Sequence, residues 1–255
     1  MRFTSLGSGS EGNALLVEAG ATRILIDCGF GIRDSITRLQ RAGVEAETLT
    51  AIMVTHEHGD HIGGVAAFAS RFGTAVWLTF GTLTVVADEF ADLPSVRSFD
   101  SHEVLAIGDI EVRPFPVPHD AREPVQFVCS DGRWRLGVLT DLGTSTAHVE
   151  ASLSGCDALV LECNHDLGLL AAGDYPPSLK QRIAGRFGHL DNAAAGELLA
   201  RIDTSRLKHL IAAHLSRENN RPDLARAALA QAVHCDPEWI GVADQVRGFA
   251  WREFV

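Results

Sequence analysis

Short apolar runs bounded by turn residues recur along the whole chain, and runs of this kind predict β-strands. They lie at residues 14–18, 23–27, 51–55, 75–79, 158–163 and 209–213. Two longer stretches each predict a pair of strands joined by a turn. These are residues 103–117, around Gly108-Asp109, and residues 125–140, around Ser130-Asp131-Gly132-Arg133.

Segments with helical spacing of apolar residues alternate with these strands. Residues 31–42 place Ile32, Ile36 and Leu39 on one helical face. Another predicted helix carries Pro222 in its first turn, where proline suits a helix start. Besides residues 31–42, the predicted helices are residues 64–71, 82–90, 178–184, 192–202 and 222–232.

Strands and helices are mixed throughout, and each half of the chain has its own set. This order predicts an α/β fold in which two sheets pack face to face with helices outside, because that arrangement buries the strands on both faces. A chain of 255 residues can bury one large core or form two small domains. Since no low-complexity stretch and no linker rich in Pro, Gly or Ser divides the chain, we expect a single domain over residues 1–255.

The composition is that of a soluble globular protein, with 46% hydrophobic and 22% charged residues. No apolar run approaches the roughly 20 residues needed to cross a bilayer. The N-terminal segment, residues 1–5, turns at once into Gly/Ser loop chemistry and has no signal-peptide pattern. The 5 cysteines are scattered, which fits buried free thiols in a reducing compartment. We therefore expect a cytoplasmic protein with no membrane contact.

The net charge of −11 at pH 7 discourages non-specific binding to nucleic acid. It leaves room for a local basic groove. The nearest candidates for such a groove are Lys180, Arg182, Arg186 and Arg217.

The segment Thr55-His56-Glu57-His58-Gly59-Asp60-His61 places three imidazoles and a carboxylate directly after a predicted strand. Three crowded histidines would repel one another if protonated, whereas a metal ion gives them a shared partner. His56 and His58 lie two residues apart in extended chain and therefore point the same way. Four donors from one tight loop suit two adjacent metals better than one. The segment therefore predicts a metal site.

Three further residues end apolar strands beside small residues, where a rigid scaffold can hold a ligand. His119 follows its strand behind two prolines that stiffen the approach, and Asp141 and His214 directly end theirs. Each alone could be a turn or loop residue. Together they supply the additional ligands that a two-metal site needs.

The pattern His-x-His-x-Asp-His after a strand resembles the signature of the metallo-β-lactamase superfamily, and the resemblance covers nearly the whole chain. It implies a four-layer αββα sandwich with a dinuclear metal site at one edge. It also implies that the cofactors are two divalent metal ions, with zinc favoured and manganese or iron as alternatives. In the implied ligand set, the first metal is held by His56, His58 and His119, and the second by Asp60, His61 and His214. Asp141 bridges both metals, and so does a hydroxide that attacks the substrate.

A bridging Asp141 resembles the thioesterases and phosphodiesterases of this superfamily more than its β-lactamases. The segment Gly188-His189-Leu190-Asp191-Asn192 resembles the Gly-His-Ser-Thr segment of ribonuclease Z-like phosphodiesterases. The resemblance implies that His189 assists the leaving group or contacts phosphate, and the adjacent helix start favours anions. The alternative is a helix-start residue with no chemistry. We predict Asp60 and His189 as the catalytic side chains.

Four segments resemble one small bacterial branch of 5′→3′ exonuclease-like proteins, linked in some bacteria to cell-wall regulators. They are residues 7–13, 161–166, 175–180 and 214–220. The first is a Gly/Ser loop that could cradle a phosphate or be a plain turn. From these segments and the His-x-Ser motif that ends at Ser216, we predict substrate contacts by Ser8, Asn13, Asn164, His165 and Ser216. The long arm of ribonuclease Z and the inserted β-CASP domain have no counterpart, which argues against tRNA or mRNA processing.

Three functions remain open at this point. The leading hypothesis is a metal-dependent phosphodiesterase, with DNA as the favoured substrate and an exonuclease as the favoured activity. The second is a small-molecule hydrolase acting on a cyclic phosphodiester or on a thioester, as glyoxalase II does, and the acidic charge favours it. The third is a non-enzymatic binding or redox-sensing module, against which the complete ligand set counts. The oligomeric state is left undetermined.

Overall fold

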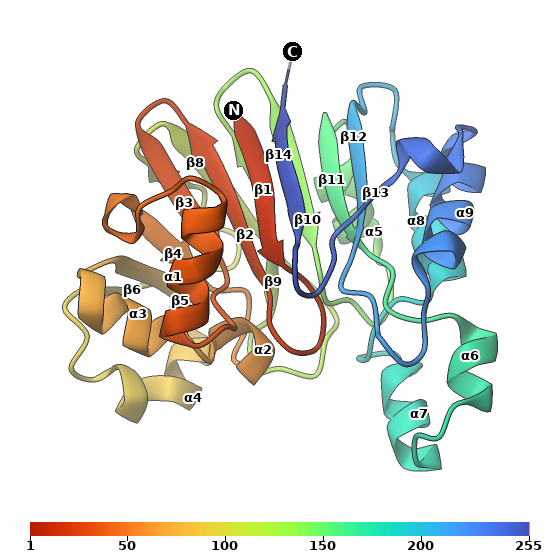
Figure 1. The fold of residues 1–255 in the computed structure, drawn as a ribbon, viewed down its shortest axis with the longest axis horizontal. Coiled ribbons are helices and arrows are strands. Elements are labelled where there is room, and N and C mark those ends of the chain that lie inside the picture. The colour runs from red at the N-terminus through yellow and green to blue at the C-terminus, as the bar shows by residue number, and fades with distance from the viewer. Residues whose placement is uncertain (255) are drawn as a thin grey trace.

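Two seven-stranded sheets pack face to face in the computed structural model, which describes residues 1–254 (Figure 1). The first sheet has the strand order β14-β1-β2-β3-β4-β5-β6, and the second has the order β13-β12-β11-β10-β9-β8-β7. The strands of the first sheet are β1 (Arg2–Gly7), β2 (Ala14–Ala19), β3 (Thr22–Ile26), β4 (Ala51–Met53), β5 (Ala75–Thr79), β6 (Val96–Phe99) and β14 (Phe249–Glu253). Those of the second are β7 (Leu105–Ile107), β8 (Ile110–Pro116), β9 (Val125–Ser130), β10 (Arg135–Leu139), β11 (Ala158–Glu162), β12 (His209–Ala213) and β13 (Gly241–Val242).

Helices cover the outer face of each sheet (Figure 1). The first sheet is covered by α1 (Ile32–Arg41), α3 (Val65–Phe72) and α4 (Phe80–Phe90), and the second by α5 (Ala147–Leu153), α8 (Asn192–Arg201) and α9 (Pro222–Val233). The shorter helices are α2 (Gly59–Ile62), α6 (Leu167–Ala172) and α7 (Pro177–Ile183), with single 3₁₀ turns at Ala46–Thr48 and Pro237–Trp239. One apolar cluster lies between the sheets and one lies under each helical layer. The predicted four-layer αββα sandwich is confirmed.

Strand β3 illustrates why successive residues of the predicted strands are apolar. Ile24 and Ile26 point into the cluster between the sheets, whereas Leu25 points into the cluster under α1 and α3. Because both faces of such a strand are buried, apolar residues are favoured on both. The same reasoning applies to Ala158–Leu161 of β11, which are apolar and buried and lead to the buried Glu162 at the strand end.

All the predicted helices and strands are present, with ends shifted by one or two residues, but several short strands were missed. Strand β1 includes part of the segment that we interpreted as Gly/Ser loop, and β14 pairs antiparallel with it, Arg2 opposite Glu253. Strand β14 is an edge strand with exposed positions along its length, so its apolar residues do not recur with a clear period. The C-terminal strand therefore joins the first sheet, whose other strands all come from the first half of the chain.

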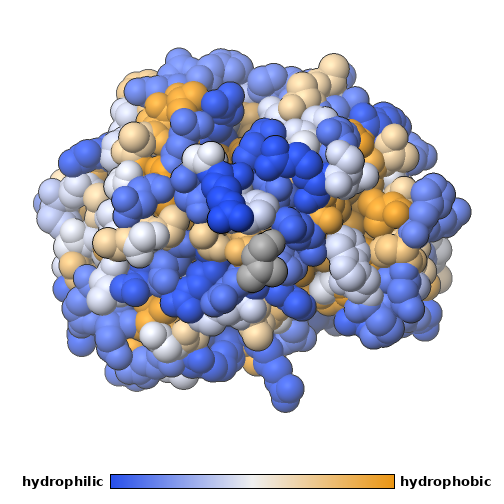
Figure 2. Space-filling view, turned by 90° about the horizontal axis from the view of Figure 1, so that it is seen from above, coloured by the Kyte–Doolittle hydropathy of each residue, from blue (hydrophilic) through white to orange (hydrophobic). Residues whose placement is uncertain are grey.

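The direction of the strands brings functional side chains to one edge of the sandwich. Strands β3 and β4 run parallel, as do β10, β11 and β12, so their carboxyl ends meet on the same side. Asp27, His56, Asp141, Glu162 and His214 all stand at or just after such strand ends. Helix α2 lies at this edge (Figure 1), and the opposite end carries both chain ends and is mainly hydrophilic (Figure 2).

Two further sequence expectations concern membranes and thiols. No helix within residues 1–254 combines the length and the apolar character that crossing a bilayer requires. Cys28, Cys129, Cys156 and Cys163 are buried, Cys235 is half-buried, and all are free. The four buried thiols pack as small apolar side chains.

We expect Gly29→Ala to lower the free energy of unfolding by about 1–3 kcal/mol or more, because the added methyl group overpacks the site. The Cβ added at Gly29 would lie 1.9 Å from the carbonyl oxygen of Asp60, so the backbone around α2 must move. Gly31→Ala is the matched control, since its Cβ meets nothing within 4 Å. Urea unfolding measures both variants. Equal midpoints for the two would contradict this close approach of residues 27–29 to the α2 segment.

Candidate metal centre

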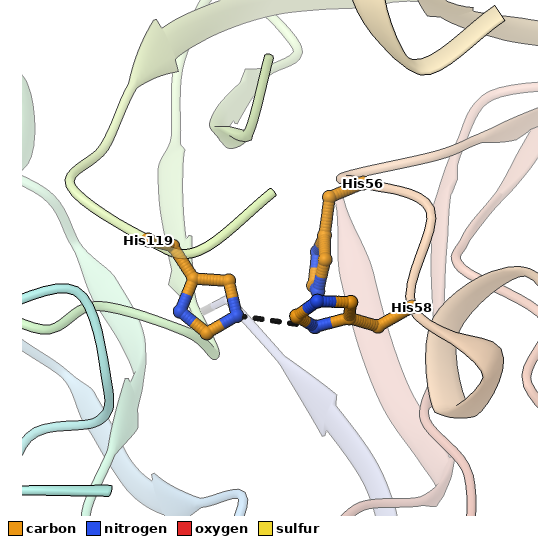
Figure 3. Close-up of side chains that lie close together, drawn as sticks. All are labelled: His56, His58 and His119. Carbon is orange, nitrogen blue, oxygen red and sulfur yellow. Dashed lines mark hydrogen bonds between the residues drawn. The ribbon is translucent and has the colours of Figure 1, made fainter. Parts of the chain in front are cut away.

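Three histidines from two loops face one another at the end of the sandwich (Figure 3). His56 follows β4, His58 precedes α2, and His119 follows β8. The His56 and His58 ring centroids lie 4.6 Å apart, and His119 Nε2 lies 3.3 Å from His58 Nδ1. One nitrogen of each ring lies within 4.8 Å of one nitrogen of each of the others. The loops after β4 and β8 therefore bring these rings together, as the sequence predicted.

A second group lies directly beside the first. Asp60, His61 and His214 also place one donor atom each within 4.8 Å of the others. Asp60 Oδ2 is 3.3 Å from His214 Nε2 and 3.4 Å from His61 Nε2. Asp141 stands between the two groups, with one oxygen 2.9 Å from His61 Nε2 and the other 3.8 Å from His119 Nε2.

In each buried imidazole, the nitrogen that points away from the other ligands, here called the outer nitrogen, has its own partner. The inner nitrogen is the one that points toward the other ligands. His61 Nδ1 lies 2.7 Å from Asp27 Oδ2, and His119 Nδ1 lies 2.9 Å from the Gly188 carbonyl oxygen. His214 Nδ1 lies 3.2 Å from Glu162 Oε1. Since these oxygens only accept, each outer nitrogen carries the proton, and in a neutral ring the inner nitrogen presents a lone pair.

Two of the inner atoms lack a hydrogen-bond donor. His56 Nε2 and Asp141 Oδ2 are buried without a hydrogen-bond partner among the described residues. Asp141 Oδ2 lies 2.9 Å from His61 Nε2, and in a neutral His61 ring that carries its proton on Nδ1 both of these atoms are acceptors. Buried acceptors that face one another need a cation between them. Imidazole nitrogens and carboxylate oxygens are donors that divalent metals accept, so these residues fit divalent metal ions.

The charges of the site favour bound cations. Burial opposes a charge on His61, but the carboxylates of Asp141, Asp27 and Asp60 outweigh it and raise the pKa of His61 well above its ordinary value. Burial likewise opposes ionisation of Asp141, yet the charges of His214 and His61 lower its pKa well below the ordinary value. For His56, by contrast, burial dominates and lowers the pKa, so this ring stays neutral and free to donate its lone pair. The carboxylates thus attract positive charge, carried either by protons or by metal ions.

Asp27 and Glu162 support the cluster and were missed from the sequence. Asp27 is buried, adopts the left-handed conformation at φ 61°, and accepts from the backbone and hydroxyl of Thr55 as well as from His61. Glu162 accepts from the Leu142 backbone at 2.8 Å and contacts both His189 and His214. Both residues end apolar strands, which is the same signal that identified Asp141.

The substrate-contact residues divide into two sets. Asn164 and Ser216 line the cavity in front of the cluster, and their contact with substrate stays a prediction. Ser8 and Asn13 lie behind the cluster instead: Ser8 Oγ accepts from the His214 backbone at 3.0 Å, and Asn13 Nδ2 lies 3.1 Å from His61 Nε2. These contacts position Asp60, His61 and His214, while a substrate contact by Ser8 or Asn13 stays a prediction. His165 is fully buried and does not line the cavity.

The cavity has a volume of about 410 Å³ and a polar floor that includes Asp60, Asp141, His189 and His214. Of the four basic candidates, Arg182 lines it. Lys180 donates to the Ala171 carbonyl, Arg217 pairs with Glu11 at 2.7 Å, and Arg186 lies over the Phe187 ring. The helix start near His189 is already capped, since the Asp191 carboxylate accepts from the first backbone N–H groups of α8. The expected anion site at that helix end is therefore occupied by the chain itself.

The chain belongs to the metallo-β-lactamase superfamily, because residues 22–214 match the family model of the Beta-lactamase superfamily domain. Among its relatives, Exodeoxyribonuclease YycJ of Bacillus anthracis is 32% identical over 248 residues, which cover 96% of this chain and 94% of the relative. A Ribonuclease Z of Mycolicibacterium paratuberculosis is 28% identical over 276 aligned residues, covering 100% of this chain and 93% of the relative. The metallo-β-lactamase fold protein YhfI from Bacillus subtilis has the same fold, with a TM-score of 0.76, 17% identity and 99% coverage of both chains.

The resemblance to the exonuclease-like branch is thereby confirmed. The chain is an enzyme with a metallo-hydrolase fold, and relatives covering nearly its whole length are nucleases. The hypothesis of a non-enzymatic module is therefore set aside.

We expect Asp27→Asn to weaken metal binding about 10- to 100-fold. Asparagine keeps the size of the side chain, but only one of its two terminal atoms accepts hydrogen bonds, so part of the contacts to Thr55 and His61 is lost. Competition against a chromophoric chelator measures the affinity. Asp223→Asn changes an exposed carboxylate in the first turn of α9 and serves as the control. Unchanged affinity in Asp27→Asn would mean that Asp27 does not orient His61 for metal.

Proposed function

We propose that this protein is a dinuclear metal-dependent phosphodiesterase that removes nucleotides from DNA ends. The observation that carries the proposal is the position of His189 at the cavity floor beside the metal-ligand cluster. Its Nδ1 lies 2.8 Å from Glu162 Oε1 and 3.2 Å from Asp141 Oδ1. A protonated imidazole in this place is what a poor leaving group, such as the alkoxide of a phosphodiester, requires.

Two metal ions are supported by two of the four overlapping side-chain groups that could hold a metal ion. His56, His58 and His119 form the first of these two groups, and Asp60, His61 and His214 form the second. Asp141 contacts members of both and is placed to bridge them. Zinc is our favoured metal, given the imidazole-rich donor set, and two such ions would supply hydroxide at neutral pH by lowering the pKa of bound water.

His189 is held in its charged form by its neighbours. Burial opposes that charge, but the Glu162 carboxylate and the hydrogen bond to Asp141 raise the pKa of His189 to about 10. Because Nδ1 faces these carboxylates, Nε2 is the atom left to donate a proton into the cavity. Glu162 in turn is fixed by the Leu142 and Leu190 backbone N–H groups at 2.8 and 3.2 Å. Glu162 is therefore a positioning residue for His189.

The choice of DNA rests on the relatives and on the chemistry of a phosphodiester. Exodeoxyribonuclease YycJ matches nearly the full length of this chain, which favours a DNA substrate over RNA. A small-molecule substrate, either a cyclic phosphodiester or a thioester, is the second candidate. The net charge of −11 and the single arginine at the cavity favour it. A cytoplasmic location remains a prediction from composition.

We expect Asp141→Ala to retain the fold but to hold fewer than two metal ions and to lose nearly all phosphodiester hydrolysis. The bridging carboxylate would be missing from both groups. Elemental analysis after reconstitution, with circular dichroism for the fold, tests this. Asp88→Ala, on the exposed surface of α4, is the control and should match the unmodified protein. At most one metal ion per chain in the unmodified protein would contradict the dinuclear proposal.

We expect His189→Ala to slow cleavage of a short DNA oligonucleotide about 10²- to 10⁴-fold. Bis-p-nitrophenyl phosphate should be affected much less, since nitrophenolate leaves without a proton. Metal content should be unchanged, and His148→Ala, an exposed histidine of α5, should behave as the unmodified protein.

Two results would overturn this assignment. Loss of a metal ion in His189→Ala would make His189 a ligand. Unchanged rates on both substrates would leave it without a part in the chemistry.

A further inference from the structure

One wall of the cavity is apolar. Tyr175, Leu179 and Ile183 line this wall, and all three are half-buried. Leu179, Arg182 and Ile183 are spaced three and four residues apart, so they share one face of α7. Helix α7 has no fully buried side chain and lies with α6 beyond the ends of the second sheet, near the α2 end of the molecule (Figure 1).

Hydrolysis at the floor does not require this wall. The metal-ligand residues and His189 act only on the phosphate and its leaving group. An apolar wall facing a charged floor instead matches a substrate with two chemically different parts. Pockets of about this volume enclose small ligands by apolar contact, with a few polar groups to fix their orientation.

Arg182 supplies a polar group on the same helical face. Its Nε donates to Asp120 Oδ2 at 2.6 Å, and Asp120 Oδ1 lies 3.5 Å from His119 Nε2. This contact ties the arginine to the loop that carries His119. It uses one edge of the guanidinium group, so the other edge can donate to a phosphate.

We infer that Tyr175, Leu179 and Ile183 form a nucleoside-binding wall, which packs against the base and sugar of the nucleotide being cleaved while Arg182 contacts a phosphate. The inference rests on the proposed phosphodiesterase function and names the substrate unit that the cavity accepts. Aromatic and aliphatic side chains accept any base, because every base has an apolar face. The wall therefore supports cleavage of DNA with little sequence preference.

Two chromogenic esters with one leaving group test the wall. One is the p-nitrophenyl ester of thymidine 5′-monophosphate, and the other is methyl p-nitrophenyl phosphate, which has no nucleoside. Both present the same scissile bond to the floor of the cavity. A difference in KM between them therefore reports contacts to the nucleoside.

We expect Tyr175→Ala to raise KM for the thymidine ester about tenfold, within the roughly 5- to 150-fold range for loss of one base-stacking contact. Its kcat, and both constants for the methyl ester, should change little. Tyr175→Phe keeps the ring and should resemble the unmodified protein. Ile183→Ala should raise KM for the thymidine ester alone. Leu167→Ala, an exposed residue of α6 outside the cavity, is the control.

Equal losses on both esters in Tyr175→Ala would overturn the inference, because the wall would then only shape the metal centre. Equal KM values for the two esters in the unmodified protein would overturn it as well. Calorimetric binding of thymidine 5′-monophosphate to the metal-loaded protein separates the wall from the proposed reaction. If neither ester is hydrolysed, the phosphodiesterase proposal fails. The wall would still be supported if Tyr175→Ala weakened nucleotide binding and left binding of inorganic phosphate unchanged. Absence of nucleotide binding to the unmodified protein would refute it.

Discussion

The rest of the structure depends on how the imidazole rings at the end of the sandwich are held. Asp27, Gly188 and Glu162 accept from the outer nitrogens of His61, His119 and His214. The inner atoms His56 Nε2 and Asp141 Oδ2 are then left buried without a hydrogen-bond partner among the described residues. Burying such a cluster of acceptors costs free energy unless a cation lies among them. The fold maintains this cluster because its scaffold is rigid, and metal binding relieves the repulsion.

The two sheets together provide that rigidity. Some residues of the cluster follow β3 and β4 of the first sheet, and others stand at the ends of β10, β11 and β12 of the second. The cluster therefore also ties the two sheets to each other. Strands that are apolar on both faces leave their ends as the places where polar side chains can gather. The left-handed conformation of Asp27 and of His214, at φ 61° and 53°, is a local strain that the surrounding contacts hold in place.

The sequence was sufficient for the layers and for the principal donors. The donors are crowded after one strand or end apolar strands, and both signals are local. Asp27 and Glu162 have the same strand-end signal, but their contribution depends on which ring nitrogen they face, which only the folded structure defines. The contacts of Asn13 with Asp60 could not be predicted from the sequence, because they depend on how the loop turns at Gly9 and Gly12, at φ 143° and 149°. The apolar wall of α7 could not be predicted either, since it arises from contacts between segments distant in sequence.

Anomalous diffraction from crystals of the zinc-loaded protein tests the central claim most directly. Data collected on both sides of the zinc absorption edge locate the ions independently of any assay. We expect two peaks, one among His56, His58 and His119 and one among Asp60, His61 and His214, each in contact with Asp141, at the roughly 3.5–4 Å separation of two-metal sites. A single peak, or zinc bound elsewhere with these side chains left facing one another, would contradict the account.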